Sequence, residues 1–201
     1  LTFPMAVGAS AILLEGPPEP EIINKIFFEE KPTLFFGVPT LFAILLASDN
    51  LPTKDEHDVR LCISAGEPLP SDLLARWQGT FGVDILDGLG TTEMLHIFVS
   101  NRPDEITPGS TGRVVPGYQI RLINDNNEVC APGEMGVLEV SGPSSALMYW
   151  GQRQKTKDTF KGTWTRTGEN YSISDKGVMT YGGRNDDMLK VGGIYVSPFE
   201  V

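Results

Sequence analysis

Asp-Gly-Leu-Gly-Thr-Thr-Glu, residues 87–93, follows a short apolar run at residues 83–86 that predicts a buried strand. Its two glycines allow the backbone to turn tightly or to lie against a ligand. The threonine hydroxyls can donate to phosphate oxygens, and a carboxylate beside phosphates makes chemical sense mainly with a divalent cation between them. The stretch therefore predicts a ligand-binding loop at the carboxyl end of a strand, where open α/β sheets bind their ligands. An ordinary strand-to-loop turn is the alternative interpretation.

The composition is typical of a globular protein. The chain has 201 residues, 40% of them hydrophobic and 21% charged, which is enough for a sizeable core and one or two domains. The net charge of −10 argues against a nucleic-acid partner held by phosphate contacts, and no apolar run approaches the roughly 18 residues of a membrane span. Cys62 and Cys130 lack metal-ligand spacing, which predicts reduced thiols and a cytoplasmic protein. Because the chain begins at Leu1 and ends in an apolar-looking segment, we expect a piece of a longer protein.

The first half of the chain alternates predicted strands and helices. Short apolar runs predict strands at residues 11–14, 34–36, 61–65 and 83–86. Helical spacing of apolar residues predicts helices at residues 21–30, 39–47 and 71–81, the last one capped by Ser71. This alternation indicates parallel strands with right-handed crossovers. His57 lies in a polar connection, so we expect its side chain to be exposed and hydrated.

The pattern changes after about Pro108. Short apolar runs at residues 114–115, 118–123, 137–140 and 177–181 are divided by Gly, Pro and Asn turns, which predicts an antiparallel, barrel-like β unit. Residues 152–160 predict one polar helix, and Gly182 with Gly183 predicts a hinge or linker. Residues 108–112 look like a phosphate loop but lack the lysine of a nucleotide P-loop at the required spacing, so they do not predict one.

Five stretches occur in an order that resembles a known family. They are residues 36–40 (Phe-Gly-Val-Pro-Thr), 64–68 (Ser-Ala-Gly-Glu-Pro), 87–93, 164–169 (Trp-Thr-Arg-Thr-Gly-Glu) and 183–187 (Gly-Arg-Asn-Asp-Asp). Together they resemble the adenylate-forming acyl-CoA synthetases, the superfamily that also holds luciferases and peptide-synthetase adenylation domains. Within it, residues 87–98 are most similar to benzoate–CoA ligases and their aryl-CoA relatives.

The resemblance implies a fold and a reaction. The fold is α/β, part of the large N-terminal domain of the acyl-CoA synthetases: an α/β layered subdomain at residues 1–108 and a β-rich, barrel-like subdomain at residues 109–182. A hinge and the start of the small C-terminal domain follow at residues 183–201. The implied reaction uses ATP and Mg²⁺ to convert an aromatic acid into an acyl-adenylate, from which coenzyme A displaces AMP to give a thioester. Two anions meet in the first step, so it needs cationic charge and positioning more than acid–base chemistry.

The resemblance also implies the nucleotide-binding residues. Thr92 matches a phosphate-binding hydroxyl, and Glu93 matches the magnesium-linked carboxylate. Arg184 matches an arginine beside the ribose and phosphates, and Asp186 matches the hinge about which the small domain rotates. Glu169 stands where the family usually has Asp, whose carboxylate accepts both ribose hydroxyls. The residues expected along the adenine and ribose are Gly66, Glu67, Pro68, Asp87, Gly88 and Leu89.

The acid is implied to bind beside the same stretch. Gly90, His96 and Ile97 match the aryl pocket of benzoate ligases, with a purely structural histidine as the alternative for His96. The family's pyrophosphate loop and its catalytic lysine are expected outside residues 1–201. We therefore expect this chain alone to have little ligase activity and its parent to be an aryl-CoA ligase.

Two other functions stay open. An adenylate-forming enzyme for a fatty, hydroxycinnamic or amino acid would use the same nucleotide residues. A non-catalytic nucleotide-binding module would be compatible with the change at Glu169. For the ligase we expect a small aromatic acid, ATP and coenzyme A as partners, without nucleic acid or a membrane span, and a homo-oligomer is possible.

Overall fold

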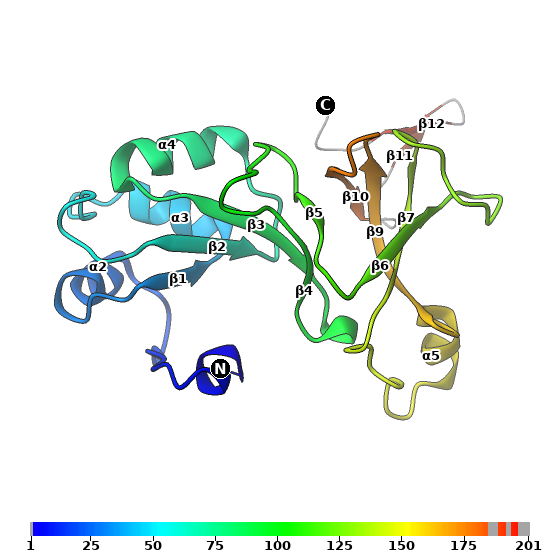
Figure 1. The fold of residues 1–201 in the computed structure, drawn as a ribbon, viewed down its shortest axis with the longest axis horizontal. Helices are drawn as coiled ribbons and strands as arrows, with labels where there is room; N and C mark the ends of the chain where they lie inside the picture. Colours follow the sequence, from blue (N-terminus) through cyan, green and yellow to red (C-terminus); the bar gives the residue numbers. More distant parts are fainter. Residues whose placement is uncertain (1, 185–188, 192–193, 197–201) are drawn as a thin grey trace.

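The computed structural model describes residues 2–184, 189–191 and 194–196, and two sheets dominate it (Figure 1). The first sheet has five strands in chain order: β1 (Leu34–Gly37), β2 (Leu61–Ala65), β3 (Ile85–Gly90), β4 (Ile97–Ser100) and β5 (Arg113–Val114). β1, β2 and β3 are parallel, as predicted, whereas β4 and β5 join antiparallel. The connection from β3 to β4 is too short for the crossover that a parallel pair requires.

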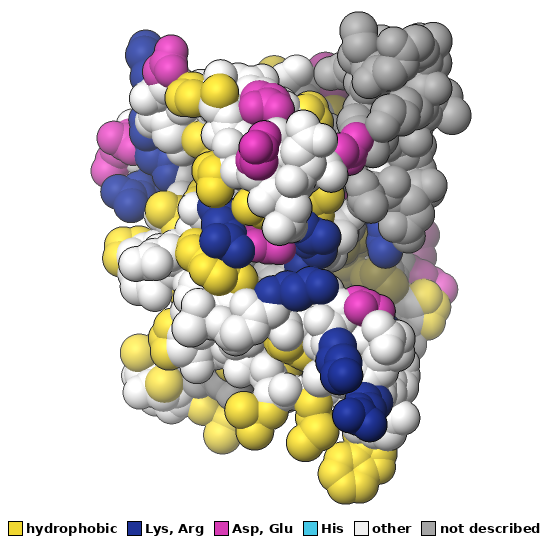
Figure 2. Space-filling model, turned by 90° about the vertical axis from the view of Figure 1, so that its right-hand side faces the viewer, with side chains coloured by type: hydrophobic (Ala, Val, Ile, Leu, Met, Phe, Trp, Pro, Cys, Tyr) yellow, Lys and Arg dark blue, Asp and Glu magenta, His cyan; other side chains and the backbone are white. Residues whose placement is uncertain are grey.

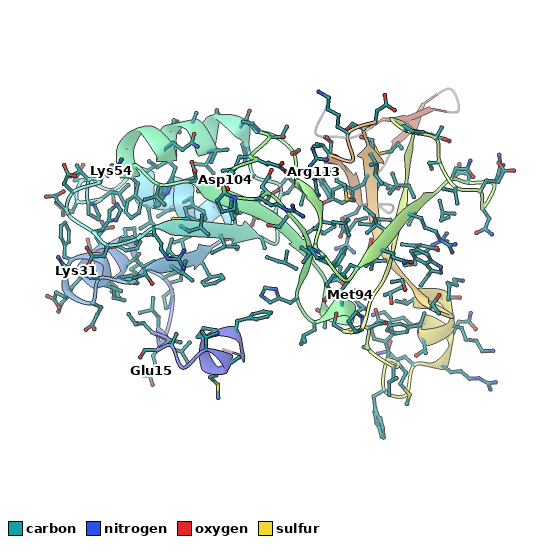
Figure 3. The ribbon with its side chains drawn as sticks, viewed as in Figure 1. Glu15, Lys31, Lys54, Met94, Asp104 and Arg113 are labelled. Atoms are coloured by element: carbon teal, nitrogen blue, oxygen red, sulfur yellow. The ribbon has the colours of Figure 1, made fainter. Side chains whose placement is uncertain are left out.

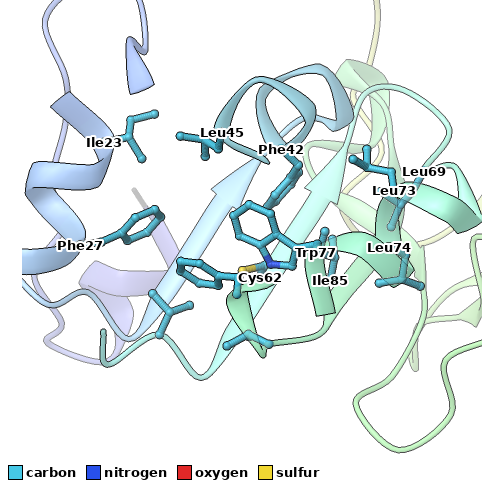
Figure 4. Packing of buried hydrophobic residues seen from close by; sticks show 13 residues of the cluster. Ile23, Phe27, Phe42, Leu45, Cys62, Leu69, Leu73, Leu74, Trp77 and Ile85 are labelled. Carbon is cyan, nitrogen blue, oxygen red and sulfur yellow. The ribbon is translucent and has the colours of Figure 1, made fainter. Parts of the chain in front are cut away.

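Helices cover one face of the parallel strands and enclose a core. They are α2 (Pro20–Glu29), α3 (Pro39–Leu46) and α4 (Ser71–Phe81). Pro20 and Pro39 start α2 and α3, because the fixed φ of proline suits the first helical turn. Trp77 of α4 lies at the centre of this core, with its ring 4.8 Å from Phe42 and 4.5 Å from Phe81 between centroids (Figure 4). The opposite face of the parallel strands stays open.

The second sheet is antiparallel and has the strand order β10-β9-β7-β6. Its strands are β6 (Gln119–Ile123), β7 (Met135–Ser141), β9 (Trp164–Ile173) and β10 (Met179–Arg184), with β8 (Phe160–Lys161) pairing with β9. α5 (Arg153–Thr159) lies between β7 and β8, and β11 (Leu189–Val191) pairs antiparallel with β12 (Ile194–Val196). The predicted α/β half followed by a β-rich half is confirmed.

Charges of both signs lie on the outer side of the second sheet. Figure 2 faces this side of the molecule and shows dark blue and magenta side chains intermingled with hydrophobic ones. Glu139 of β7 is buried and forms ion pairs with Arg121 at 2.7 Å and with Arg166 at 3.1 Å. Arg121 also stacks on the Trp164 ring, 4.2 Å from its centroid. The buried carboxylate is thereby compensated.

A second core joins the two sheets. It contains Phe98 and Val99 from β4 and Leu138 and Val140 from β7, all fully buried. Met94, also fully buried, belongs to the 3-10 turn η1 (Thr92–Met94), and Figure 3 places it where the two halves of the molecule meet. The buried side chain of Met94 therefore fixes the turn that follows β3 between the sheets, while its neighbours Thr92 and Leu95 are exposed.

Two predictions for the N-terminal part are wrong. Residues 11–14 form no strand: they are a connection whose apolar side chains are exposed, including Leu13 at 69%, and they pair with no strand in the described part of the chain. A short helix, α1 (Thr2–Ala6), precedes them. Ser71 does not cap α4: the N-cap is Pro70, in an extended conformation, and Ser71 is the first helical residue.

Two glycine-containing segments also differ from their predictions. Residues 87–90 continue β3 and do not form a loop, so the loop begins only at Thr91. Gly182 and Gly183 lie within β10, both buried, where the register with β9 shifts between Tyr181 and Gly183. Glycine is common at such bulges, which gives the same sequence signal as a linker.

The proposed subdomain boundary can be compared with the sheets. The first sheet extends to Val114, and the second begins at Gln119.

No helix within residues 2–184 has the length and hydropathy that a membrane span needs.

Candidate functional site

A cavity of about 630 Å³ opens on the uncovered face of the parallel strands. Ile63 and Ala65 of β2 line it, because side chains alternate along a strand and their neighbours Cys62 and Ser64 point into the helix-covered core. The other wall comes from the segment between β3 and β4. It contributes Gly90, Thr91, Thr92, Leu95, His96 and Ile97. Gly90, His96 and Ile97, the three residues expected to bind the acid, thus lie along one largely apolar cavity.

Gly90 allows the two ends of this wall to touch. A Cβ atom at Gly90 would lie 2.6 Å from the carbonyl oxygen of His96 and 2.9 Å from the backbone nitrogen of Ile97. Any side chain there would separate β3 from the start of β4. Because Gly90 has no side chain, the backbone of β3 lies close to the backbone at the start of β4, and this close approach shapes the cavity wall.

Leu95 turns the chain back toward the cavity. Its backbone has φ 70° and ψ −46°, and the His96 amide donates to the Met94 carbonyl at 2.8 Å. These values define a γ-turn of the rare, strained type. The turn presents His96 to the cavity, where its ring meets the Phe3 ring edge-on at 4.5 Å between centroids. Partial burial lowers the pKa of His96 below its ordinary value, so the imidazole is neutral at neutral pH.

Glu93 lies in η1, on the side of the turn nearest the second sheet. Its carboxylate accepts a short hydrogen bond from the Tyr149 hydroxyl. Partial burial acts to raise the pKa of Glu93, but the Tyr149 hydrogen bond and the Glu93 backbone amide outweigh it, so the pKa is lowered. The carboxylate is thus ionised at neutral pH. Its neighbour Thr92 is exposed and lines the cavity on the other side of the same turn.

The donor set at Glu93 fits Mg²⁺ bound together with phosphates. No group of three or more His, Cys, Asp or Glu side chains within the described ranges could form a protein cage for a metal ion. Mg²⁺ bound with nucleotides needs only one or two carboxylates, and substrate phosphates and water supply the rest. An ionised Glu93 beside the hydroxyl-bearing Thr92 meets that requirement.

Asp87 is buried where the two sheets meet. Its side chain is 6% exposed and hydrogen-bonds to the Thr111 hydroxyl, which also lies 3.3 Å from the Tyr171 hydroxyl. Burial raises the pKa of Asp87 from 3.8 to about 7. Burial likewise raises the pKa of Tyr171, with the charges of Asp87 and Glu169 adding to the effect. Asp87 and Glu169, which lie far apart in sequence, thus belong to one polar region.

The remaining residues expected at the nucleotide lie around this region. Gly66 has φ +91°, a conformation that favours glycine, and it begins the loop after β2. In that loop Glu67 accepts a hydrogen bond from Thr40 at 2.7 Å, and Pro68 is exposed. Gly88 and Leu89 are in β3, paired with Ser100 and Val99.

Glu169 and Arg184 lie opposite each other on the adjacent strands β9 and β10. They are register partners in the antiparallel pair of β9 and β10, so their side chains start about 5 Å apart. The positive charge of Arg184 is thereby placed beside the carboxylate expected at the ribose. Asp186, the expected hinge residue, lies outside the described residues.

Several residues of the site were not identified from the sequence. Tyr149 and Thr111 come from connections of the β-rich half, and only their positions in space relate them to Glu93 and Asp87. Phe36 and Val38 line the cavity, although aromatic and branched residues in this stretch predict core. Phe36 is 56% exposed in the structure, which its place in an apolar run does not indicate.

The prediction for His57 is wrong. The side chain is only 7% exposed, stacks on Phe81 at 3.8 Å between ring centroids, and hydrogen-bonds through Nε2 to the Phe81 carbonyl oxygen at 2.9 Å. Nδ1 also accepts from the Val59 amide at 3.1 Å. His57 is therefore a structural histidine of the first core, which the polar residues around it in the sequence do not indicate.

The fold, the open cavity and the adjoining hydroxyl–carboxylate turn define the class. Residues 1–150 match the family described as AMP-binding enzyme, and the chain belongs to that family. The resemblance found in the sequence is thus confirmed.

Individual relatives point to aryl-acid ligases. A benzoate–CoA ligase of Thauera aromatica is 52% identical over 202 residues, covering all of this chain and 38% of the relative. The crystal structure of a benzoate CoA ligase from Burkholderia xenovorans LB400 superimposes with a TM-score of 0.94 at 48% identity, covering 100% of this chain and 40% of that one. The anthranilate CoA ligase AuaEII in complex with anthranoyl-AMP has a TM-score of 0.93 at 42% identity, with coverage of 100% and 39%. The chain therefore spans about two fifths of these proteins.

Proposed function

We propose that this chain is part of an ATP-dependent aryl-acid–CoA ligase that releases AMP. The observation that carries the proposal is one continuous wall: residues 90–97 line the apolar cavity and include the Thr92–Glu93 pair. An aromatic acid with its ring in the cavity would direct its carboxylate toward that pair. The relative bound to anthranoyl-AMP, an aryl-adenylate, supports this arrangement.

In the proposed adenylation step, these residues bind and orient. Gly90, His96 and Ile97 would pack against the ring of the acid, and the neutral His96 would leave the bound acid as the only charge in the hollow. Thr92 would donate to phosphate oxygens. Glu93 would hold Mg²⁺, which neutralises phosphate charge when bound. Attack of the acid carboxylate oxygen on the α-phosphorus would then form the acyl-adenylate and release pyrophosphate.

The nucleoside would lie at the junction of the two sheets. The loop of Gly66, Glu67 and Pro68 and the β3 residues Asp87, Gly88 and Leu89 would line the adenine and ribose. Glu169 would accept the ribose hydroxyls, and Arg184 would face the ribose–phosphate side. In the second half-reaction the thiol of coenzyme A would attack the acyl carbon, and AMP would leave. Asp186 is proposed as the hinge for that change, and the free thiols Cys62 and Cys130 fit a cytoplasmic location.

The proposal is tested on the full-length parent enzyme. Pyrophosphate exchange into ATP, measured separately with benzoate, decanoate and phenylalanine, should be fastest with benzoate, and coenzyme A should convert the adenylate into benzoyl-CoA. Replacement of Ile97 by Trp would fill the cavity and should raise the KM for benzoate more than that for ATP. Exchange with decanoate or phenylalanine alone would favour another acid. Nucleotide binding without exchange would favour a non-catalytic module.

A further inference from the structure

The turn that carries Glu93 is held by one loop of the β-rich half. This clamp loop, residues 142–149, follows β7 and makes three hydrogen bonds to η1. The Ala146 amide donates to the Glu93 carbonyl oxygen at 2.7 Å, and Ser144 Oγ donates to the Met94 carbonyl oxygen at 2.7 Å. The Tyr149 hydroxyl donates to Oε1 of Glu93. Both the backbone and the carboxylate of the turn are therefore fixed from the same side.

Tyr149 is itself fixed by α5. Its amide donates to Thr156 Oγ1 at 3.1 Å, and its ring lies 5.6 Å from that of Phe160 between centroids. The Lys155 ammonium lies 4.1 Å from the centre of the Tyr149 ring, a cation–π contact. Three contacts therefore hold Tyr149 in place in addition to its hydrogen bond to Glu93.

The type of donor matters for a carboxylate that is to meet a cation. A glutamate side chain has three rotatable bonds, and holding it in one orientation avoids an ordering cost when the ligand binds. A phenol hydroxyl holds the carboxylate without neutralising its charge, whereas an arginine or lysine in direct contact would compete with the cation. One carboxylate oxygen accepts from Tyr149, and the group keeps its charge for a second partner.

We propose that Tyr149 is a positioning residue that holds the Glu93 carboxylate in the orientation in which it meets the Mg²⁺ of MgATP. The proposal rests on the proposed ligase function, since it takes Glu93 to be the magnesium-linked carboxylate. The clamp loop thus connects the β-rich half to the step in which ATP reacts, and the charge of Lys155, which lies over the Tyr149 ring, also favours the ionised Glu93.

The experiment uses the full-length parent with Tyr149→Phe, which keeps the ring and removes only the hydroxyl. MgATP binding is measured by calorimetry over a series of Mg²⁺ concentrations without acid, so that no turnover is needed. Hydrogen bonds to charged groups contribute on the order of tenfold or more in affinity. We expect the Mg²⁺ concentration for half-saturation to rise about tenfold, with the KM for benzoate unchanged. Tyr118→Phe is the matched control: it removes a hydroxyl that lies 2.8 Å from Ser144 Oγ of the same loop but does not contact Glu93.

The outcomes separate the alternatives. A Mg²⁺ requirement that falls in Tyr149→Phe would show that the phenol competes with the cation, and this result overturns the proposal. An unchanged requirement with a melting temperature lowered as in Tyr118→Phe would show a purely structural tyrosine and also overturns it. A wild-type parent that binds MgATP but activates no aryl acid would contradict the ligase function, while the calorimetric comparison would still decide the role of Tyr149. A wild-type parent that binds no MgATP would contradict both.

Discussion

Asp87 makes stability depend on pH in an unusual direction. Its pKa rises from 3.8 to about 7 on burial, so between about pH 4 and pH 7 the folded state keeps a proton that the unfolded state releases. Stability then falls as the pH rises through this window, and it changes no further above the folded pKa. At about 1.4 kcal/mol per pH unit, the total loss is on the order of 4 kcal/mol.

Asp87→Asn should remove this dependence. Urea unfolding at pH 5 and at pH 7.5 is the measurement: we expect the variant to gain stability relative to wild type between the two values. Asp104→Asn, at an exposed loop position, is the control and should parallel wild type at both pH values. Parallel curves for Asp87→Asn and wild type would contradict the assignment of the raised pKa.

Leu95 permits a second test at a single residue. At ordinary exposed positions glycine is less stable than alanine, because glycine leaves the unfolded chain more freedom. Leu95 is 73% exposed and has φ 70°, a region that costs a residue with a Cβ about 1–2 kcal/mol. We therefore expect Leu95→Gly to be more stable than Leu95→Ala by about 1 kcal/mol in thermal or urea unfolding. At Leu147, which is 89% exposed without a positive φ, the same pair should show the opposite order, and the same order at both positions would contradict the strain.

Single residues were predicted from the sequence when their chemistry was local. Gly90, Thr92 and Glu93 belong to one short stretch, so their proximity follows from the chain itself. Tyr149 lies 56 residues from Glu93 and meets it only because the two sheets share a core. The polar neighbours of His57 masked its burial for the same reason: burial is a property of the packed molecule, and periodicity reports it only within one element.

At the scale of elements, the contact between the end of β3 and the start of β4 can be tested with two glycines. Gly90→Ala would bring Cβ within 2.6–2.9 Å of the backbone of His96 and Ile97, and backbone on both sides cannot yield easily. Overpacking of this kind costs about 1–3 kcal/mol. Gly79→Ala in α4 meets open space and should stabilise by up to about 1 kcal/mol, since alanine favours helix. Chemical unfolding of both variants is the measurement, and a neutral Gly90→Ala would contradict the close approach.

Helices and parallel strands were predictable, but the limits of β3 were not. The apolar runs and helix-starting prolines specify α2, α3 and β1–β3, because the periodicity of each element is visible in its own residues. Asp87 and Gly88 carry no strand signal, yet they continue β3 because β2 on one side and β4 on the other supply backbone partners. β4 was missed as a strand since its four residues follow a γ-turn that no sequence pattern announces.

The order of the two halves was predictable for the molecule as a whole, whereas the way they join was not. The loss of helical periodicity after Pro108 marks the β-rich half. The joint depends on Met94, Phe98 and Val99, which pack on Leu138 and Val140 across the sheets, and apolar residues do not reveal their partners in advance. Asp87 and Glu169, two of the residues proposed to bind the nucleotide, both act on Tyr171 of this joint, so the candidate site depends on the assembly of both halves.

The last prediction concerns what the 201-residue chain does on its own. The cavity of about 630 Å³ and the apolar joint between the two halves are both formed within it, whereas the ionised Glu93 and the carboxylate expected at the ribose leave little positive charge for a triphosphate. We expect the chain to bind a non-hydrolysable benzoyl-AMP analogue about tenfold or more tightly than AMP, because burying a phenyl ring contributes roughly 1.5–3 kcal/mol. Thioester formation should be undetectable, since the chain covers only 38% of the benzoate ligase of Thauera aromatica.

Calorimetric titration of both ligands measures the difference, and Ile97→Trp is the variant that should abolish it while leaving AMP binding intact. Equal binding of the two ligands by the wild-type chain would mean that the cavity does not receive the aryl ring. Robust formation of benzoyl-CoA by the isolated chain would contradict the prediction more deeply, because the adenylation step would then need no cationic groups beyond those along the joint, such as Arg184 opposite Glu169.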